Sequence, residues 1–132
     1  MSTPATGTFK IASWEEHPYD DVEGQVKLTQ ATVGVSFQGD LDGEGTTVYL
    51  MTYREDESAS YVYLQRVVGR LGGRAGGFVL QGGGAYERGV ARGDWSVVAG
   101  SGTGELRGLQ GEGGFTSGEE RSGSYTLDYE LA

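Results

Sequence analysis

The segment WEEHP (residues 14–18) contains residue types that acid–base chemistry uses. Glu15 and Glu16 are adjacent, so in a strand their side chains point to opposite faces and one of them faces the interior. We predict that Glu16 is this inward carboxylate and the catalytic residue, with a pKa raised by burial above the ordinary value of about 4.3. Glu15 is the competing assignment, because a shift of register by one residue exchanges the faces. In a solvated loop both carboxylates would be exposed, as we expect for His17.

Aromatic residues recur at every second position in two segments that we expect to form neighbouring strands. In TTVYLMTYR (residues 46–54) two tyrosines and a methionine share one face, and in ASYVYLQRVVGRL (residues 59–71) two tyrosines and a glutamine do the same. Such faces are typical of ligand cavities, in which a few hydroxyl and amide groups lie among apolar surface. The competing interpretation is a filled core whose hydroxyls bond one another. The predicted ligand-binding residues are Trp14, Tyr49, Met51, Tyr53, Tyr61, Tyr63, Gln65 and Gln81.

The glycine-rich stretch GSGTGELRGLQGEGGF (residues 100–115) could be taken for a phosphate-binding loop. A P-loop needs a Lys–Ser/Thr pair before a helix, and a dinucleotide fingerprint needs G-x-G-x-x-G. Here the glycines are spaced G-x-G-x-x-x-G, so Arg107 stands where the fingerprint has its third glycine. No amphipathic helix follows. We therefore interpret them as glycines for positive φ and close backbone approach. One helical turn would place Leu106 and Leu109 in the end of a barrel.

The charge balance argues against polyanionic partners. The chain has 10 basic and 19 acidic residues, a net charge of −9, and no stripe of lysine or arginine. An acidic surface repels nucleic-acid backbones and anionic membranes, so we expect neither as a partner. The N-terminal MSTPATGTFK lacks the pattern of a leader peptide, and no apolar run approaches membrane-spanning length. We expect a cytoplasmic protein.

The residue inventory also limits metal and nucleophile chemistry. The chain has no cysteine, which excludes disulfides, zinc–thiolate sites and thiol nucleophiles. Its single histidine, His17, would have to be the base of any Ser-His-Asp triad. The acidic residues of DLDGEG (residues 40–45) resemble a calcium loop, but position twelve of such a loop is Met51. We therefore expect no metal and no cofactor.

The elements that must position these residues are strands. Alternation with period 2 dominates the chain, and helical periodicity is almost absent. The expected strands are residues 6–14, 25–39, 46–54, 59–71 and 78–81, a hairpin at 85–100, then 112–117 and 121–131, with turns at 40–45, 55–58 and 72–77. We predict one domain, residues 1–132, that is an all-β closed antiparallel barrel of about eight strands, just wide enough for one small ligand. A twisted sheet with one amphipathic face is the alternative.

Apolar residues occupy both faces of residues 61–71. Val62, Leu64 and Val68 alternate with the tyrosines and would lie on the outside of a barrel. Large exposed apolar patches rarely stay uncovered. We therefore expect a homo-oligomer.

The glycine-rich segment at residues 100–115 resembles the crossover that precedes the last strands of allene oxide cyclase and dirigent-like barrels. Together with SWEEHPYD (13–20), GDLDGEGTTVYLMTY (39–53) and GRLGGRAGGFVLQ (69–81), it is similar to the bacterial domain-of-unknown-function family 3224 along nearly the whole chain. The resemblance implies an allene-oxide-cyclase-like, lipocalin-like barrel, and it implies little about activity because fold does not fix function. That family tends to have a glutamate at Gln65 and a histidine at Gly82, and this chain lacks both groups.

The resemblance further implies a barrel that encloses a small, mostly apolar molecule without a cofactor. In allene oxide cyclases such a cavity folds a reactive chain and promotes ring closure, so catalysis is largely by confinement. Our leading hypothesis is a small-molecule-binding barrel, with a cofactor-independent cyclase or isomerase as the favoured activity. A non-catalytic carrier or sensor of a small apolar ligand is the second hypothesis. A structural oligomer with a filled barrel is the third.

Overall fold

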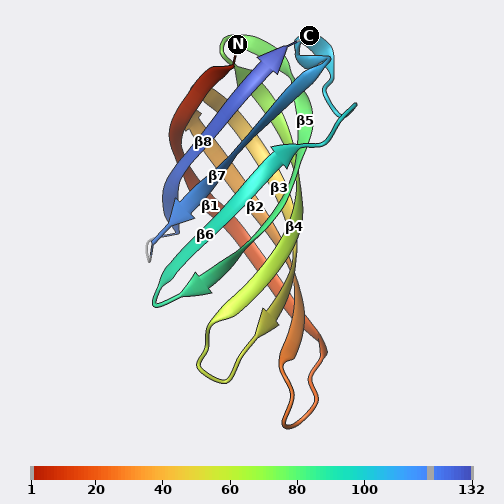
Figure 1. Ribbon diagram of the computed structural model, residues 1–132, viewed down its shortest axis with the longest axis vertical. Coiled ribbons are helices and arrows are strands. Elements are labelled where there is room, and N and C mark those ends of the chain that lie inside the picture. Colours follow the sequence, from red (N-terminus) through yellow and green to blue (C-terminus); the bar gives the residue numbers. More distant parts are fainter. Residues whose placement is uncertain (1, 119–120, 132) are drawn as a thin grey trace.

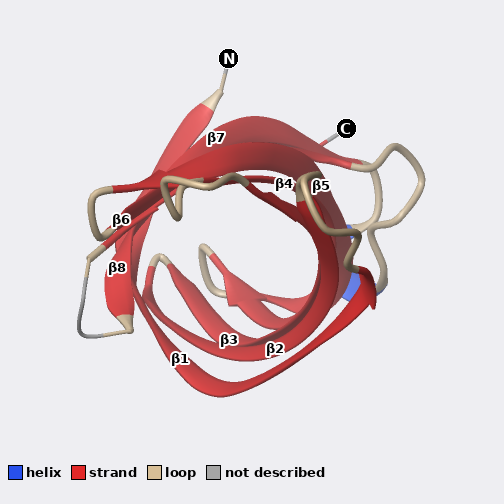
Figure 2. Cartoon of the chain, turned by 90° about the horizontal axis from the view of Figure 1, so that it is seen from below, coloured by secondary structure: helices blue, strands red, loops and turns tan. Residues whose placement is uncertain are grey.

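Eight antiparallel strands form a closed barrel in which each strand pairs with its neighbours in the chain (Figures 1 and 2). The computed structural model describes residues 2–118 and 121–131. The elements are β1 (Thr3–Asp20), β2 (Lys27–Gly39), β3 (Leu41–Tyr53), β4 (Ala59–Leu71), β5 (Arg74–Glu87), β6 (Val90–Val97), the 3-10 helix η1 (Gly104–Leu106), β7 (Leu109–Ser117) and β8 (Ser122–Leu131). Pairing of β1 with β8 closes the wall. The predicted all-β closed antiparallel barrel is confirmed.

Two predicted turns are largely strand. Residues 40–45 have turn composition, yet β3 begins at Leu41, and β5 begins at Arg74 within the predicted turn at 72–77. The period-2 pattern continues through DLDGEG, because Leu41 and Gly45 are buried while Asp42 is exposed. Gly43 also lies opposite Gly69, where a Cβ would approach the Gly69 Cα to 2.7 Å. Here glycine permits close strand pairing rather than a turn.

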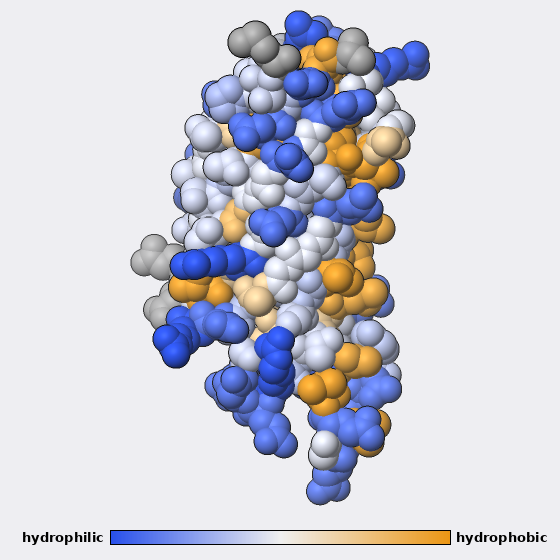
Figure 3. Space-filling model, viewed as in Figure 1, coloured by the Kyte–Doolittle hydropathy of each residue, from blue (hydrophilic) through white to orange (hydrophobic). Residues whose placement is uncertain are grey.

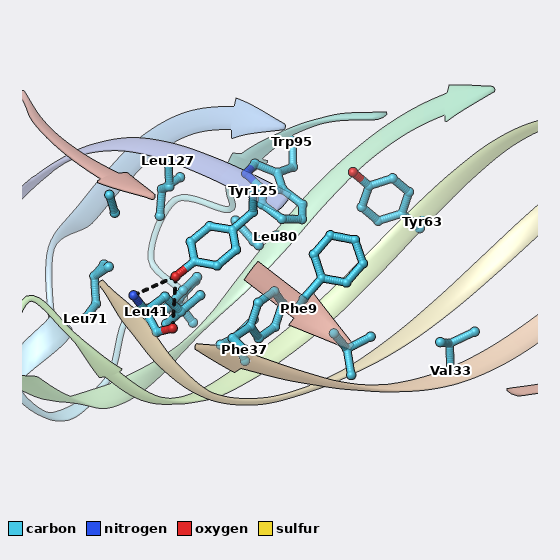
Figure 4. Close-up of a cluster of buried hydrophobic side chains, with 14 of the residues drawn as sticks. Phe9, Val33, Phe37, Leu41, Tyr63, Leu71, Leu80, Trp95, Tyr125 and Leu127 are labelled. Carbon is cyan, nitrogen blue, oxygen red and sulfur yellow. Dashed lines mark hydrogen bonds between the residues drawn. The ribbon is translucent and has the colours of Figure 1, made fainter. Parts of the chain in front are cut away.

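One half of the barrel interior is filled with side chains (Figure 4). Leu41, Leu71, Leu80 and Leu127 are each 1% exposed or less. The hydroxyl of Tyr125 accepts a hydrogen bond from the Leu41 N–H at 2.9 Å and lies 3.0 Å from the Leu41 carbonyl oxygen. This bond ties β8 across the interior to the start of β3. Leu106 and Leu109 are also buried, as predicted from their spacing.

The glycine-rich crossover between β6 and β7 completes the wall at this end. The N–H of Thr103 donates to the carbonyl of Gly77 on β5 at 2.9 Å, and the N–H of Gly77 donates to Thr103 Oγ1 at 3.0 Å. The N–H of Val79 donates to Ser101 Oγ at 3.0 Å. The crossover therefore covers the edge of β5 beyond the last residue that pairs with β6. A Cβ at Gly76 would lie 2.1 Å from the Thr103 carbonyl oxygen, so this close approach requires glycine.

At the other end, the hairpin of β1 and β2 extends beyond the rest of the barrel (Figure 1). β1 pairs with β8 only along residues 3–10 and pairs with β2 as far as Asp20. A β-bulge between Ile11 and Ser13 shifts the alternation by one residue. Trp14 and Glu16 consequently face inward, while Glu15 is exposed. The bulge therefore makes Glu16, rather than Glu15, the carboxylate that faces inward.

The outer face of β3 and β4 carries an apolar patch made of Val48, Leu50, Val62, Leu64 and Val68. Val48 lies opposite Leu64 and Leu50 opposite Val62, so these side chains are contiguous across the two strands. Figure 3 shows hydrophobic residues gathered along the side of the barrel where β4 lies. The predicted outward apolar face is therefore present.

Candidate functional site: the internal cavity

The half of the barrel nearer the β3–β4 turn encloses a cavity of about 350 Å³. Seven of the eight predicted ligand-binding residues line it, namely Trp14, Tyr49, Met51, Tyr53, Tyr61, Tyr63 and Gln65. The shared faces predicted for these residues are correct, because Tyr49 lies opposite Tyr63 and Met51 lies opposite Tyr61. The strands thus present one continuous wall to the cavity.

Tyr49 is the centre of this wall. Its ring stacks on Trp14 with centroids 5.9 Å apart and meets the edges or faces of Tyr61 and Tyr63 at 5.3 and 5.2 Å. Such tilted and offset arrangements are favourable for aromatic rings. Burial raises the pKa of Tyr49 to about 12, so its hydroxyl stays protonated at neutral pH. This hydroxyl has no hydrogen-bond partner among the described residues.

The hydroxyls of Tyr61 and Tyr63 reach across β5 and bond the backbone of β6. Their hydroxyls donate to the carbonyl oxygens of Arg92 and Asp94 on β6, each at 2.8 Å. To reach β6 they pass over β5, where Gly84 and Gly82 lie opposite them. A Cβ at Gly82 would lie 1.8 Å from the Asp94 carbonyl oxygen, and one at Gly84 would lie 1.9 Å from the Arg92 carbonyl oxygen, so glycine leaves free the two oxygens that accept these bonds. Desolvation by burial raises the pKa of both phenols, which therefore remain neutral.

Gln65 lies where the cavity meets the filled half of the barrel. Its side chain is 3% exposed, and its Nε2 donates to Thr47 Oγ1 at 2.5 Å. Its Oε1 is buried with no hydrogen-bond partner among the described residues. Gly45 lies against this amide and the Phe37 ring, since a Cβ there would be 3.4 Å from Gln65 Nε2 and 3.0 Å from Phe37 Cε2.

The carboxylate of Glu16 accepts three hydrogen bonds on the inner face of the β1–β2–β3 wall. The donors are Trp14 Nε1 at 3.0 Å, Thr29 Oγ1 at 2.6 Å and the Tyr53 hydroxyl at 2.6 Å. Of the described residues, Tyr53 rather than Glu16 lines the cavity. Glu16 can therefore influence the cavity through Trp14 and Tyr53, the two cavity-lining residues that it bonds.

The predicted rise in the pKa of Glu16 is wrong. Desolvation by burial does push it upward, but hydrogen bonds from Thr29, Tyr53 and Trp14, with the charge of Lys27, outweigh this effect and lower it. Glu16 is therefore ionised at neutral pH and is a weak base. Burial and the bond to Glu16 raise the pKa of Tyr53, so the phenol keeps its proton.

The position predicted for Gln81 is also wrong. Phe78 and Leu80 are buried inside the barrel, so by alternation Gln81 points outward, and it is exposed. His17 is exposed as well. Within residues 2–118 and 121–131, no three His, Cys, Asp or Glu side chains are placed to hold a metal ion. Among these same residues there is also no helix of the length and apolarity needed to cross a membrane.

The sequence analysis did not select several residues that complete the site. Phe9, Trp95 and Phe115 line the cavity, and the Phe115 ring lies 5.9 Å from Phe9 and 5.5 Å from Trp95. Thr29, which bonds Glu16, is 2% exposed. Thr29 continues by one step the alternation that buries Ala31, Val33, Val35 and Phe37. The same period-2 pattern could therefore have indicated that Thr29 faces inward.

These features define an eight-stranded antiparallel barrel that is packed in one half and hollow in the other. A family model described as "Protein of unknown function (DUF3224)" matches residues 5–129. The chain belongs to this DUF3224 family. It is similar to the crystal structure of a DUF3224 protein of unknown function from Shewanella oneidensis MR-1, with 32% identity and a TM-score of 0.81 over 100% of this chain and 99% of that chain. No curated protein matches the chain significantly.

Proposed function

We propose that this barrel binds one small, mostly apolar molecule in its internal cavity. The observation that carries the proposal is the volume of about 350 Å³ inside a barrel whose other half is filled with side chains. Ligand pockets span about 300–1,000 Å³, so this volume suits a ligand at the small end of that range. A purely structural barrel would need no such space.

The chemistry of the wall supports a neutral ligand. Trp14, Tyr49 and Trp95 offer rigid aromatic surface, and the buried tyrosines keep their protons. Burying an unpaired charge in such surroundings is costly. The one cation that lines the cavity among the described residues, Arg121, is exposed. A neutral apolar body therefore matches the wall.

A carrier or sensor fits this site better than an acid–base enzyme, because Glu16 is ionised and lies behind Tyr53. A cofactor-independent cyclase or isomerase is our second candidate, and it agrees with the resemblance to allene oxide cyclases. The observation that favours it is the fixed negative charge of Glu16, bonded to a cavity-lining phenol. Such a charge stabilises a cationic transition state in a confined substrate.

Occupancy of the cavity can be measured directly. The two tryptophans of the chain, Trp14 and Trp95, both line it, so their fluorescence reports on a bound molecule. We expect native mass spectrometry of freshly purified protein to show a co-purified small molecule on the 14.0-kDa chain. We also expect saturable changes in emission on titration with menthol, a non-fluorescent apolar alcohol. Absence of both results would refute the proposal. Conversion of a compound in a metabolite screen would separate the enzyme from the carrier.

A further inference from the structure

Gln65 has an unsatisfied hydrogen-bonding atom at the inner end of the cavity. Along β4 it is the last residue that lines the cavity, since Val67 and Leu71 belong to the filled half. Its Nε2 is bonded to Thr47, and its buried Oε1 has no partner among the described residues. A buried acceptor that has lost its bonds to water costs free energy. A ligand that donates a hydrogen bond there would remove this cost.

Three tyrosine hydroxyls of the wall already donate to fixed partners. Tyr61 and Tyr63 donate to backbone carbonyls of β6, and Tyr53 donates to Glu16. The hydroxyl of Tyr49 has no partner among the described residues, and Tyr49 lies two residues from Thr47 on the same face of β3. Because Thr47 is opposite Gln65, the two unbonded groups project from neighbouring positions of one wall.

We propose that the ligand is an apolar molecule with one neutral hydrogen-bond donor, such as a hydroxyl group, at its inner end. The donor bonds Gln65 Oε1, and the Tyr49 hydroxyl contacts the same end of the ligand. The terminal torsion of glutamine is soft, so the carbonyl can turn toward the cavity. This inference rests on the proposed ligand-binding function and adds the chemical class of the ligand.

The neutrality of the donor follows from its surroundings. Gln65, Thr47 and Tyr49 are uncharged, and the carboxylate of Glu16 already accepts three bonds elsewhere on the wall. An ammonium group beside Gln65 would be buried without a counter-charge, which is far more costly than burying a hydroxyl. A ligand without any donor would leave Gln65 Oε1 unbonded.

Menthol and menthone provide a matched pair of probes. They have almost the same size and shape, and menthone keeps an oxygen acceptor but lacks the donor. We expect the wild-type chain to bind menthol about tenfold more tightly than menthone, the effect of roughly one buried hydrogen bond. Tryptophan fluorescence and titration calorimetry measure both affinities.

Variants then assign the preference to one atom. In Gln65→Met, which keeps the length of the side chain without its acceptor, the preference should fall to about one. Gln81→Met makes the same change at an exposed glutamine that does not line the cavity, so it is the matched control and should keep the full preference. Circular dichroism checks the fold of each variant, and Gln65→Leu replaces Gln65→Met if the latter does not fold.

The outcomes separate the two proposals. Equal binding of both probes by the wild type, tighter binding of menthone, or an unchanged preference in the folded Gln65 variant would overturn the assignment of a donor. In each of these cases the barrel would still bind small apolar molecules. Failure of both probes to bind saturably would count against the ligand-binding function itself.

Discussion

Three donors surround the carboxylate of Glu16, and they determine its charge. Strand alternation predicted Glu16 as the inward carboxylate, with Glu15 as the competing assignment, and the rise expected in its pKa assumed that an inward carboxylate is simply desolvated. The structure adds Thr29 and Tyr53 as donors, which no spacing within residues 13–20 indicates. The sign of a pKa shift depends on such partners from other strands. The inward orientation of Glu16 was therefore predictable from the sequence, whereas the direction of its pKa shift was not.

We predict that Glu16→Gln lowers the free energy of unfolding at neutral pH by about 1 kcal/mol, because the amide cannot accept all three hydrogen bonds. The loss is limited to this size because solvent screens a partly exposed group. The folded pKa of Glu16 lies below its ordinary value of 4.5. The ionised carboxylate therefore contributes stability above about pH 4.5, and this contribution is lost as the pH falls through the folded pKa. Urea unfolding at several pH values measures the difference between wild type and variant.

Glu15→Gln is the matched control, since it removes the same charge from an exposed neighbour. Its stability should follow that of the wild type at all pH values. If Glu16→Gln were equally stable at pH 7, or if the difference persisted unchanged at pH 3, the bonded carboxylate would not be the stabilising group.

At the scale of elements, alternation predicted most strands and could not predict the bulge in β1. The only sign of the bulge in the sequence is that the apolar residues move from odd positions at Phe9 and Ile11 to an even position at Trp14. Plain alternation did not use this sign, so Glu15 remained a competing assignment to Glu16. Alternation also predicts the inner face of β3 and β4 correctly, but Gln81 was selected by residue type against its own parity. For Gln81, the period-2 pattern was a better guide to the direction of the side chain than the residue type was.

The glycine-rich crossover is the element whose structural role is clearest. Gly76 on β5 lies against the carbonyl oxygen of Thr103, where a Cβ would be 2.1 Å away. We predict that Gly76→Ala destabilises the barrel by about 2 kcal/mol, because backbone must move and the crossover loses its bonds to Gly77. Thermal and urea unfolding measure this loss.

Gly118→Ala serves as the comparison, because a Cβ at Gly118 meets no atom of the described residues within 4 Å. It should change stability by less than about 0.5 kcal/mol. Equal effects of the two substitutions would mean that loss of glycine flexibility, rather than the contact with Thr103, causes the destabilisation.

At the scale of the whole molecule, one barrel combines a packed half and a hollow half. Sequence analysis left a lined cavity and a filled core as alternatives for the tyrosine segments. Both occur, at different levels of the same strands: aromatic and polar residues face the cavity, and leucines fill the other end. Their separation depends on strand stagger around the closed wall, which the register fixes and composition does not.

The apolar patch on β3 and β4 lies outside this arrangement and predicts self-association. Its five side chains are between 39% and 62% exposed. They amount to roughly 400 Å² of apolar surface, about half of the 800 Å² that each partner contributes to a standard interface. Arg66 lies between Leu64 and Val68 on the outer face of β4, and the exposed Glu44 lies opposite Val68. We expect an isologous interface, in which the patch faces its own copy.

We predict that light scattering at micromolar concentration gives the mass of an oligomer, at least twice the 14.0 kDa of one chain. Leu64→Glu places a charge in the centre of the patch and should yield the monomer, because a buried unpaired carboxylate is costly. Thr126→Glu introduces the same charge on the outer face of β8 and should leave the mass unchanged. A wild-type chain that is a clean monomer, or a Leu64→Glu variant with the wild-type mass, would show that this patch is not the interface. The patch faces outward, whereas the cavity is lined by the opposite face of the same two strands, so association through the patch should leave the cavity unchanged. Menthol affinity should then be the same for the Leu64→Glu monomer and the wild-type oligomer.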